Sequence, residues 1–395
     1  MTPDEQLRPE MLLLLHCAAG DDSTAGAETV GHLARDVADW TKLIELATRH
    51  ALVPLVAQEL ALAASDVVPP LVLSRLRTST QQGVMRSLQL SGELVDAVHA
   101  MTAFGVDPMP FKGPTLAVLA YGSLSLRQYE DLDILVRRQE VDRARKALLS
   151  LGYRPVNAYN ESQRTSIRLS GHHEQFVKQD SGATIELHWS LNNRSLTHDS
   201  FEHHWWENRQ SVAIGGVEMR TLGVEQMLLY LCMHGGKHSW RRLSWICDFQ
   251  RALRAYPNAY WSRVWALARE NGAARMLEIG LLLVESILEA APLTAAAKQG
   301  RSGDAEAKVV SELIAHRFRQ DAESEPSLDY RLQLRSRERQ RDRIRYTWHI
   351  LATPHPADVA LLGLPRPLHG IYYIFRPVRL LFKHLSRRLG LARAA

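Results

Sequence analysis

The sequence predicts an α+β protein in which one small mixed sheet is embedded in a mostly helical chain. Apolar residues recur at helical spacing over residues 39–64, and the helical pattern returns from Gly223 onwards. Between these segments, residues 105–220 contain short β-prone runs separated by Gly and Pro turns. With 395 residues, 46% of them hydrophobic, the chain is long enough for two or three domains with full cores.

Four segments are expected along the chain: an N-terminal helical region (1–104), a small α/β domain (105–220), a helical domain (221–350) and a basic, Pro-containing amphipathic tail (351–395). Strands are predicted over 106–111 and 131–136, with hairpins over 174–190 and 212–219. Apolar spacing and helix breakers predict helices over 5–18, 39–64 with a break at Pro54, 70–104 as two helices, 115–121, 140–151, 223–234, 239–255, 260–271, 273–290, 306–320 and 331–350.

Two carboxylates, Asp131 and Asp133, open one of the predicted strands. Because side chains alternate across a strand, these two share one face, while Leu132 and Ile134 face the other side. Like charges on one face repel each other and lose hydration, and a divalent cation between them removes that conflict. The alternative for this pattern is an exposed edge strand that binds nothing.

A third carboxylate, Glu186, lies in the second strand of the first predicted hairpin. Alternation places Glu186 and His188 on one face of that strand, opposite Ile185 and Leu187. A carboxylate on a neighbouring strand would complete a site for one or two Mg²⁺ ions, which prefer oxygen ligands and also bind triphosphate oxygens. Mn²⁺ is the alternative metal for such a site.

A phosphate-binding turn is predicted at Lys112 and Gly113, which follow an extended segment and open a helix. Glycine lets backbone N–H groups approach a phosphate at the helix N-terminus, and the lysine adds a positive charge. Arg127, which precedes Asp131, has two interpretations. It holds a γ-phosphate or braces the Asp pair, or it forms a simple salt bridge.

A second basic cluster lies where Gly235-Gly236 is expected to interrupt a helix. In one interpretation, its basic side chains line a cleft that faces the carboxylates and bind triphosphate or acceptor. In the other, the segment is a polar helix junction in which Asp248 pairs with Arg241 or Arg242. The neighbouring Cys232 matches no standard zinc spacing. The basic residues of the functional interpretation are Lys237, His238 and Arg242.

Four short motifs together carry a resemblance to a known family. They are Phe-Lys-Gly at 111–113, Asp-Leu-Asp-Ile-Leu-Val at 131–136, Ile-Glu-Leu-His-Trp at 185–189 and His-Gly-Gly-Lys-His at 234–238. In these motifs the chain resembles the uncharacterised bacterial nucleotidyltransferase family of the polymerase β-like superfamily. The resemblance implies a nucleotidyltransferase-like α/β domain, with Lys112 and Gly113 in place of the superfamily's Gly-Gly/Ser turn. Members are often encoded beside polysaccharide or modified-peptide biosynthesis functions.

The expected function is Mg²⁺-dependent transfer of a nucleoside monophosphate (NMP) from a nucleoside triphosphate (NTP) to an unknown hydroxyl or phosphate acceptor. The alternatives are a non-catalytic nucleotide-binding or protein-interaction module, and an RNA-directed transferase. We expect Asp131, Asp133 and Glu186 to be catalytic and to bind the metal, with Glu186 also helping to deprotonate the acceptor. The nucleotide-binding residues are expected to be Lys112, Gly113, Arg127, Lys237, His238 and Arg242.

Charge is distributed unevenly along the chain. The net charge is +5, and its excess lies in residues 331–345 and after Arg376, so the basicity that indicates a specific nucleic-acid partner is absent. Three cysteines without a disulfide framework fit a reducing, cytoplasmic setting, and no apolar run reaches the length of about 18 residues needed to span a membrane. The basic segment 368–388, with Pro377 as an expected break, either lies peripherally at the inner membrane surface or packs its apolar face on the body.

Overall fold

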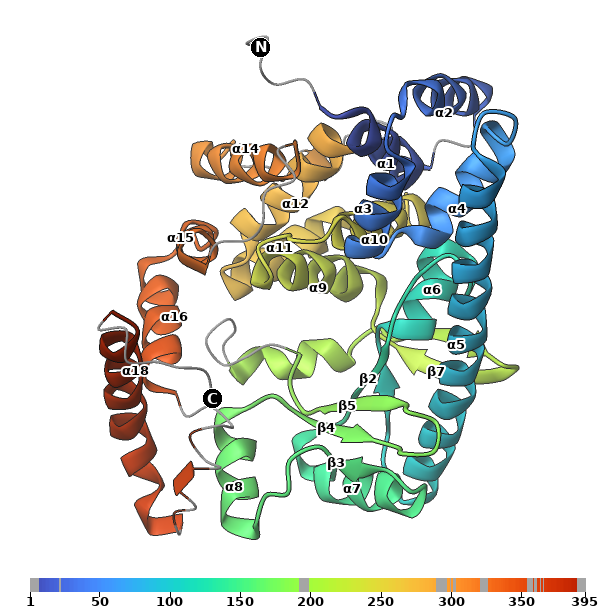
Figure 1. The fold of residues 1–395 in the computed structure, drawn as a ribbon. Helices are drawn as coiled ribbons and strands as arrows, with labels where there is room; N and C mark the ends of the chain where they lie inside the picture. Colours follow the sequence, from blue (N-terminus) through green and yellow to red (C-terminus); the bar gives the residue numbers. More distant parts are fainter. Residues whose placement is uncertain are drawn as a thin grey trace.

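Helices make up most of the protein, and one five-stranded sheet lies among them (Figure 1). The predicted α+β class, with a small mixed sheet in a mostly helical chain, is confirmed in this computed structural model. The division into four segments stays a prediction. The structure describes residues 7–388 except 21–22, 192–198, 289–296, 299, 301–302, 320–325, 354–357, 359–360, 363 and 365.

The main sheet has the strand order β1-β2-β5-β4-β3. β2 and β5 run parallel, and the other neighbouring strands of this sheet are antiparallel. Both predicted hairpins are confirmed, the first as β4–β5 and the second as a separate two-stranded sheet, β6–β7. The strands are β1 (Met109–Pro110), β2 (Asp131–Leu135), β3 (Arg154–Pro155), β4 (His173–Val177), β5 (Thr184–His188), β6 (Gln210–Ile214) and β7 (Val217–Thr221).

The central strands have one apolar face and one polar face, as the alternation predicts. Leu132 of β2 and Ile185 and Leu187 of β5 are buried in one hydrophobic cluster. Side chains of α5 (Pro70–Ala103) and α7 (Val141–Ser150) complete this cluster and cover the apolar face of the sheet. The other face is therefore left for the polar side chains of β2 and β5.

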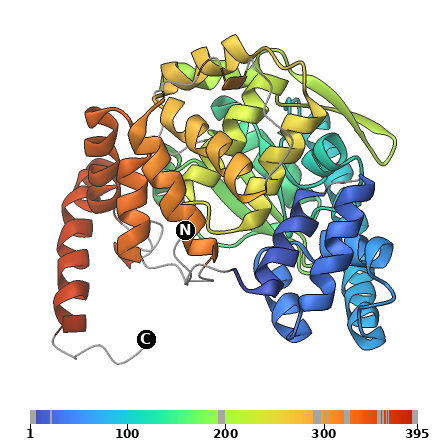
Figure 2. The same ribbon diagram turned by 90° about the horizontal axis from the view of Figure 1, so that it is seen from above.

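A second hydrophobic core joins the N-terminal helices to the helices that follow the sheets. Figure 2 shows these two groups of helices next to each other, and α1 contacts α10. A short helix, α6 (Gly113–Tyr121), packs against both α10 and β2 and so links this core to the sheet. The helices of this body are α1 (Pro9–Ala19), α2 (Thr24–Asp36), α3 (Trp40–Arg49), α4 (Val53–Ala63), α9 (Val224–Lys237), α10 (Leu243–Ala255), α11 (Trp261–Asn271), α12 (Ala274–Ile287) and α14 (Ala305–Arg319).

Several helix boundaries differ from the prediction. Residues 70–103 form one helix because isolated glycines such as Gly83 cost only about 1 kcal/mol each and do not end a helix. The predicted helix 331–350 is two helices, because the chain turns where Arg337 is buried over the Tyr346 ring. Two largely polar helices, α2 and α8, are absent from the prediction. The remaining helices are α8 (Glu161–Ser170), α15 (Pro326–Arg335), α16 (Gln340–Ala352) and α18 (Tyr372–Arg388), with short 3₁₀ turns at Arg138–Glu140, Asp199–Trp206 and Arg366–Ile371.

The helix α9 continues through Gly235 and Gly236 to Lys237, so the expected interruption there is wrong. Packing explains the glycine at 235, because a Cβ atom at that position would lie 2.4 Å from the ring of Trp240. The Trp240 side chain is buried and fills the space beside Gly235. This close approach shapes the turn into α10, which begins at Leu243 rather than at residue 239.

Replacing this glycine tests the packing explanation. Gly235→Ala should lower the free energy of unfolding by about 1–3 kcal/mol, because the new methyl group overlaps the Trp240 ring. Gly83→Ala is the matched control, since Gly83 also lies inside a helix and a Cβ there meets nothing within 4 Å. The control should raise stability by about 0.4–1 kcal/mol. Urea unfolding measures both, and equal effects would contradict the explanation.

Candidate active site

The parallel pairing of β2 with β5 brings acidic side chains together. In its register Asp133 lies opposite Glu186, and Leu135 lies opposite His188. Ligand atoms of Asp133, Glu186 and His188 all lie within 4.8 Å of one another. Asp131 lies two residues before Asp133 on the same strand face, close enough for its charge to interact with both other carboxylates. Two of the three carboxylates expected from the sequence, Asp133 and Glu186, therefore lie at the distance of shared metal ligands together with His188, whereas Asp131 lies beside this group and outside it.

Asp133 is the buried centre of this group. The ammonium nitrogen of Lys112 lies 2.8 Å from Asp133 Oδ1, and His188 Nε2 lies 3.0 Å from the same oxygen. Burial alone would raise the pKa of the Asp133 carboxyl, but these two partners hold it well below its usual range. Burial would likewise lower the pKa of Lys112, and the charge of Asp133 raises it instead. Both contacts use Oδ1, so Oδ2 of Asp133 is left for a ligand.

His188 links Asp133 to Glu186. Its Nε2 also lies 3.2 Å from Glu186 Oε2, so one nitrogen of the imidazole contacts both carboxylates. Burial disfavours the protonated, charged form of the ring, but hydrogen bonds to Asp133 and Glu186 raise the pKa of His188. On β4, His173 stacks on His188 with ring centroids 5.1 Å apart, and its Nε2 is 3.8 Å from Glu186 Oε1. Burial and the neighbouring His188 lower the pKa of His173 to about 4.

Sequence reasoning did not assign either of these histidines to the site. A signal existed for His188, because strand alternation places it on the same face as Glu186. The position of His173 depends on β4 pairing with β5, which sets His173 opposite His188. The hairpin predicted over 174–190 pairs these two strands, but its predicted first strand begins at Glu174 and so leaves His173 outside it. Only the three-dimensional register brings the second histidine to the carboxylates.

Asp131 is the carboxylate that lacks a cationic partner. It forms no ion pair with any residue that the structure describes, and burial together with the charge of Asp133 raises its pKa. A cation bound nearby would favour the ionised form of Asp131. The carboxylates of Asp133 and Glu186, with Asp131 beside them, suit the hard, oxygen-preferring ions Mg²⁺ and Mn²⁺.

Lys112 and Gly113 lie where β1 leads into α6, next to the carboxylates. Gly113 has a φ of +53°, and a Cβ atom there would lie 3.4 Å from the carbonyl oxygen of Asp131. The left-handed backbone and the close approach both favour glycine at this position. The turn therefore places Lys112 on Asp133 and the N-terminus of α6 beside β2. That the turn binds phosphate stays a prediction.

Arg127 forms the salt bridge that the sequence left open. Its Nε and Nη2 donate hydrogen bonds to the carboxylate of Asp248 on α10, at 2.8 and 2.9 Å. The hydroxyl of Tyr121 donates to the same carboxylate at 2.7 Å. The partner of Asp248 is thus Arg127, and the pairing with Arg241 or Arg242 that the junction interpretation expects is wrong. Nη1 of Arg127 is buried and makes no hydrogen bond to the described residues, so it can still donate to a ligand.

A cavity of about 420 Å³ opens beside Asp131 and Asp133, a size typical of small-molecule sites. On its opposite wall, His238 stacks on Trp245 with ring centroids 4.9 Å apart. Lys237 is not among the lining residues, and its Nζ lies 3.5 Å from His172 Nε2. Two residues of the predicted basic cluster therefore reach this cavity and the third does not. The lining includes the predicted phosphate-binding turn and several basic and aromatic side chains: Lys112, Gly113, Arg127, His238, Arg242 and Trp245.

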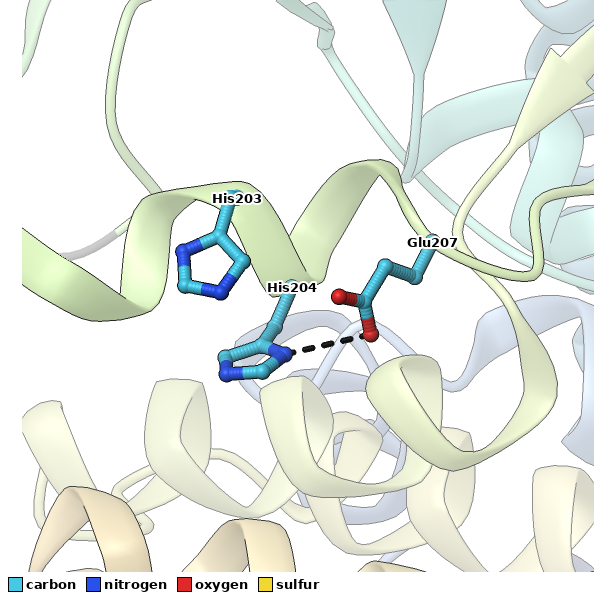
Figure 3. A group of neighbouring side chains, drawn as sticks. All are labelled: His203, His204 and Glu207. Atoms are coloured by element: carbon cyan, nitrogen blue, oxygen red, sulfur yellow. Dashed lines mark hydrogen bonds and ion pairs between the residues drawn. The ribbon is translucent and has the colours of Figure 1, made fainter.

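A second group of metal-binding residue types, His203, His204 and Glu207, lies before β6 (Figure 3). His204 Nδ1 is 3.1 Å from Glu207 Oε2. The guanidinium of Arg263 also contacts this carboxylate oxygen, at 3.3 Å. The arginine already supplies the positive charge that a metal would bring, so we assign no ion to this group.

Removal of the Asp248 carboxylate tests whether its pair with Arg127 is structural. Asp248→Ala should lower the free energy of unfolding by about 3–5 kcal/mol, because it leaves Arg127 buried without a countercharge. Asp142→Ala is the matched control, since Asp142 pairs with Arg168 at the exposed surface and such pairs contribute about 0–1 kcal/mol. Urea unfolding compares the two variants. An Asp248→Ala effect as small as that of the control would rule out a structural role.

One of the comparisons with known proteins identifies a family. No curated protein and no solved structure matches the chain. The family described as uncharacterised nucleotidyltransferase matches residues 36–289, which is more than half of the 395 residues. The matched range contains the carboxylates, the Lys112 turn and both walls of the cavity, and it ends before α14. The chain therefore belongs to the uncharacterised nucleotidyltransferase family.

Proposed function

We propose that the protein is a metal-dependent nucleotidyltransferase that transfers NMP from NTP to a hydroxyl or phosphate acceptor. One observation carries this proposal: carboxylates on two parallel strands meet beside a cavity whose lining includes basic and aromatic side chains. Family membership supports NTP transfer in general terms. The metal, the roles of individual residues and the kind of acceptor are argued from the site.

We assign Asp131, Asp133 and Glu186 to the metal. Bound Mg²⁺ or Mn²⁺ would supply positive charge for the attacking oxygen and the leaving pyrophosphate. Asp131 supports this assignment most strongly, because it has no cationic partner among the described residues and its pKa is raised. His188 acts as a positioning residue, since its Nε2 contacts both Asp133 and Glu186.

The NTP occupies the 420 Å³ cavity in this proposal. Its phosphates meet Lys112, the unpaired Nη1 of Arg127 and Arg242, with the N-terminal amides of α6 adding the positive end of a helix. The nucleobase stacks on the aromatic pair of His238 and Trp245, because every base offers a flat π-face. The basic residues would thus bind the triphosphate end of the NTP, and the aromatic pair would bind its nucleobase end.

The acceptor approaches from the Glu186 side of the carboxylates. Glu186 and His173 do not line the NTP cavity, and their side chains are 22% and 32% exposed. An acceptor hydroxyl at this side can reach Glu186, which as ligand or base helps to deprotonate it. Donor and acceptor then meet at the carboxylates from two different directions.

Asp131→Asn tests the metal assignment. The amide removes the repulsion with Asp133, so stability in metal-free buffer should stay the same or rise. Mg²⁺ at about 100 times its dissociation constant should add about 2.7 kcal/mol to the unfolding free energy of the wild type but not of the variant. Pyrophosphate release should fall by at least about 10³-fold, because several kcal/mol of charge stabilisation are lost.

The matched control is Asp180→Asn, in the exposed turn between β4 and β5. This variant loses one negative charge on the same hairpin as Glu186, and it should keep the Mg²⁺ response and the turnover of the wild type. Full activity and a normal Mg²⁺ response in Asp131→Asn would refute the metal assignment.

Arg242→Ala tests the cavity as the NTP site. The substitution should weaken Mg²⁺–NTP binding by about 10- to 100-fold, because a hydrogen bond to a charged group contributes about 1.5–3 kcal/mol. Arg241→Ala is the control, since Arg241 does not line the cavity and lies 3.9 Å from Asp329. Calorimetry with ATP and GTP measures both variants. Equal affinities for the two variants would place the nucleotide elsewhere.

One observation favours a second function, a non-catalytic nucleotide-binding module. Lys112 and His188 already balance the charges of Asp133 and Glu186, so these strands are held together without a metal. A module of this kind would bind Mg²⁺–NTP in the calorimeter but release no pyrophosphate with any acceptor in a broad panel.

A further inference from the structure

The last helix of the described chain, α18, turns charged side chains inward and apolar side chains outward. Arg376 and Arg379 contact Asp358 at 2.8 and 2.5 Å, and Asp358 is 0% exposed. Ile374, in contrast, is 70% exposed, and Phe382 is similarly exposed. An amphipathic helix that packs on a protein body has the opposite arrangement. The solvent-facing side of α18 is therefore built to contact something else.

The exposed apolar residues of α18 follow a regular spacing. Ile374, Val378 and Leu381 recur every three or four residues and so form one stripe along the helix, and Ile371, the last residue of the preceding 3₁₀ turn, continues this spacing. The expected break at Pro377 is wrong, since the helix runs through it and the stripe is continuous. The helix α16, which packs against α18, carries further exposed apolar residues. We call the whole set the C-terminal apolar surface: Ile344, Trp348, Leu351, Ile371, Ile374, Val378, Leu381 and Phe382.

Exposed apolar residues are concentrated in this part of the described chain. Of 21 exposed large hydrophobic side chains, 12 lie between residues 344 and 382. Scattered exposed apolar residues are normal, whereas a concentration of them indicates an interaction site. α16 and α18 lie at one edge of the molecule in both views, away from α5 at the other edge (Figures 1 and 2).

Net charge identifies the kind of partner. Residues 331–395 contain 14 Lys and Arg but three Asp and Glu, whereas residues 1–330 contain 34 and 40. A second copy of the chain would bring an equally basic segment against the first, which is unfavourable. An anionic bilayer satisfies both properties, because it accepts apolar side chains and attracts basic segments. The rings of Trp348 and Tyr373, both exposed, are of the type that favours the membrane interface.

We propose that the C-terminal apolar surface binds the surface of an anionic lipid bilayer. α18 and α16 lie in the interface plane, with the apolar stripe in the acyl boundary and basic residues of the same segment other than Arg376 and Arg379, which pair with Asp358, near the headgroups. No described helix is long and apolar enough to cross a membrane, so this contact is peripheral. The proposal does not depend on the nucleotidyltransferase assignment, because the family match ends before these helices.

Vesicle co-sedimentation with the full chain tests the proposal. The wild type should bind vesicles of equal amounts of phosphatidylcholine and phosphatidylserine at least about ten-fold more tightly than pure phosphatidylcholine vesicles. Binding should weaken when salt rises from about 0.1 M to 1 M, because the screening length falls from about 10 Å to 3 Å. Failure to bind the anionic vesicles would overturn the proposal.

A pair of double variants with the same charge change locates the contact. Ile374→Glu with Phe382→Glu should reduce anionic vesicle binding by at least about ten-fold. Leu62→Glu with Leu71→Glu is the control, because Leu62 is 76% exposed on α4 and Leu71 is equally exposed on α5. Equal loss in both pairs would overturn the proposal.

A variant on α16 keeps the test independent of how well α18 folds. Ile344→Glu with Trp348→Glu should also reduce vesicle binding, with the unfolding midpoint of the wild type retained. Light scattering tests whether a second copy of the chain occupies this surface instead of a membrane. A wild-type dimer that either glutamate pair converts to monomer would overturn the membrane proposal.

Discussion

The parallel pairing of β2 with β5 is the constraint on which the rest of the site depends. Side chains alternate along each strand, so a slip of one residue would move Glu186 into the apolar face and Ile185 out of it. Burial of Leu132, Ile185 and their neighbours under α5 and α7 therefore fixes the register. Packing on one side of the sheet thus determines where Asp133 and Glu186 meet on the other side. The polar constellation is a consequence of hydrophobic burial.

Charge balance is the second requirement that this pairing creates. Two carboxylates within 4.8 Å of each other at a partly buried place repel, and the fold offsets this with Lys112 and the bridging His188. Asp131 forms no salt bridge with a described residue, and the charges of Lys112 and Arg127 offset its burial and its repulsion from Asp133 only in part, because its pKa stays raised. In the proposed function a divalent ion held by these carboxylates would supply further positive charge, and Lys112, which lines the cavity, would lie next to the phosphates.

The sequence predicted which residues belong to the site better than it predicted which residues they pair with. Alternation within a strand is local, so the shared face of Asp131 and Asp133 and the candidacy of Glu186 followed from spacing alone. The salt bridge of Arg127 joins residues 121 positions apart, and nothing local specifies Asp248 as the partner. The tendency of glycine to end a helix was overestimated, because it too depends on contacts between distant parts of the chain. Gly235 and other glycines fit dense packing or tolerate a helix, which only tertiary structure decides.

The Arg127–Asp248 pair connects the two walls of the cavity, because Arg127 precedes β2 and Asp248 lies on α10. Two of the guanidinium nitrogens hold this connection, and the third is buried without a partner among the described residues. A phosphate at Nη1 would complete the hydrogen bonding of a group that the fold has already desolvated. In this proposal the Arg127 side chain would therefore both bind the nucleotide and hold the two walls of the cavity together. Substitution of Arg127 would disturb both nucleotide binding and the cavity walls. Substitution of Arg242 or Asp131 would test binding without breaking the contact between the walls.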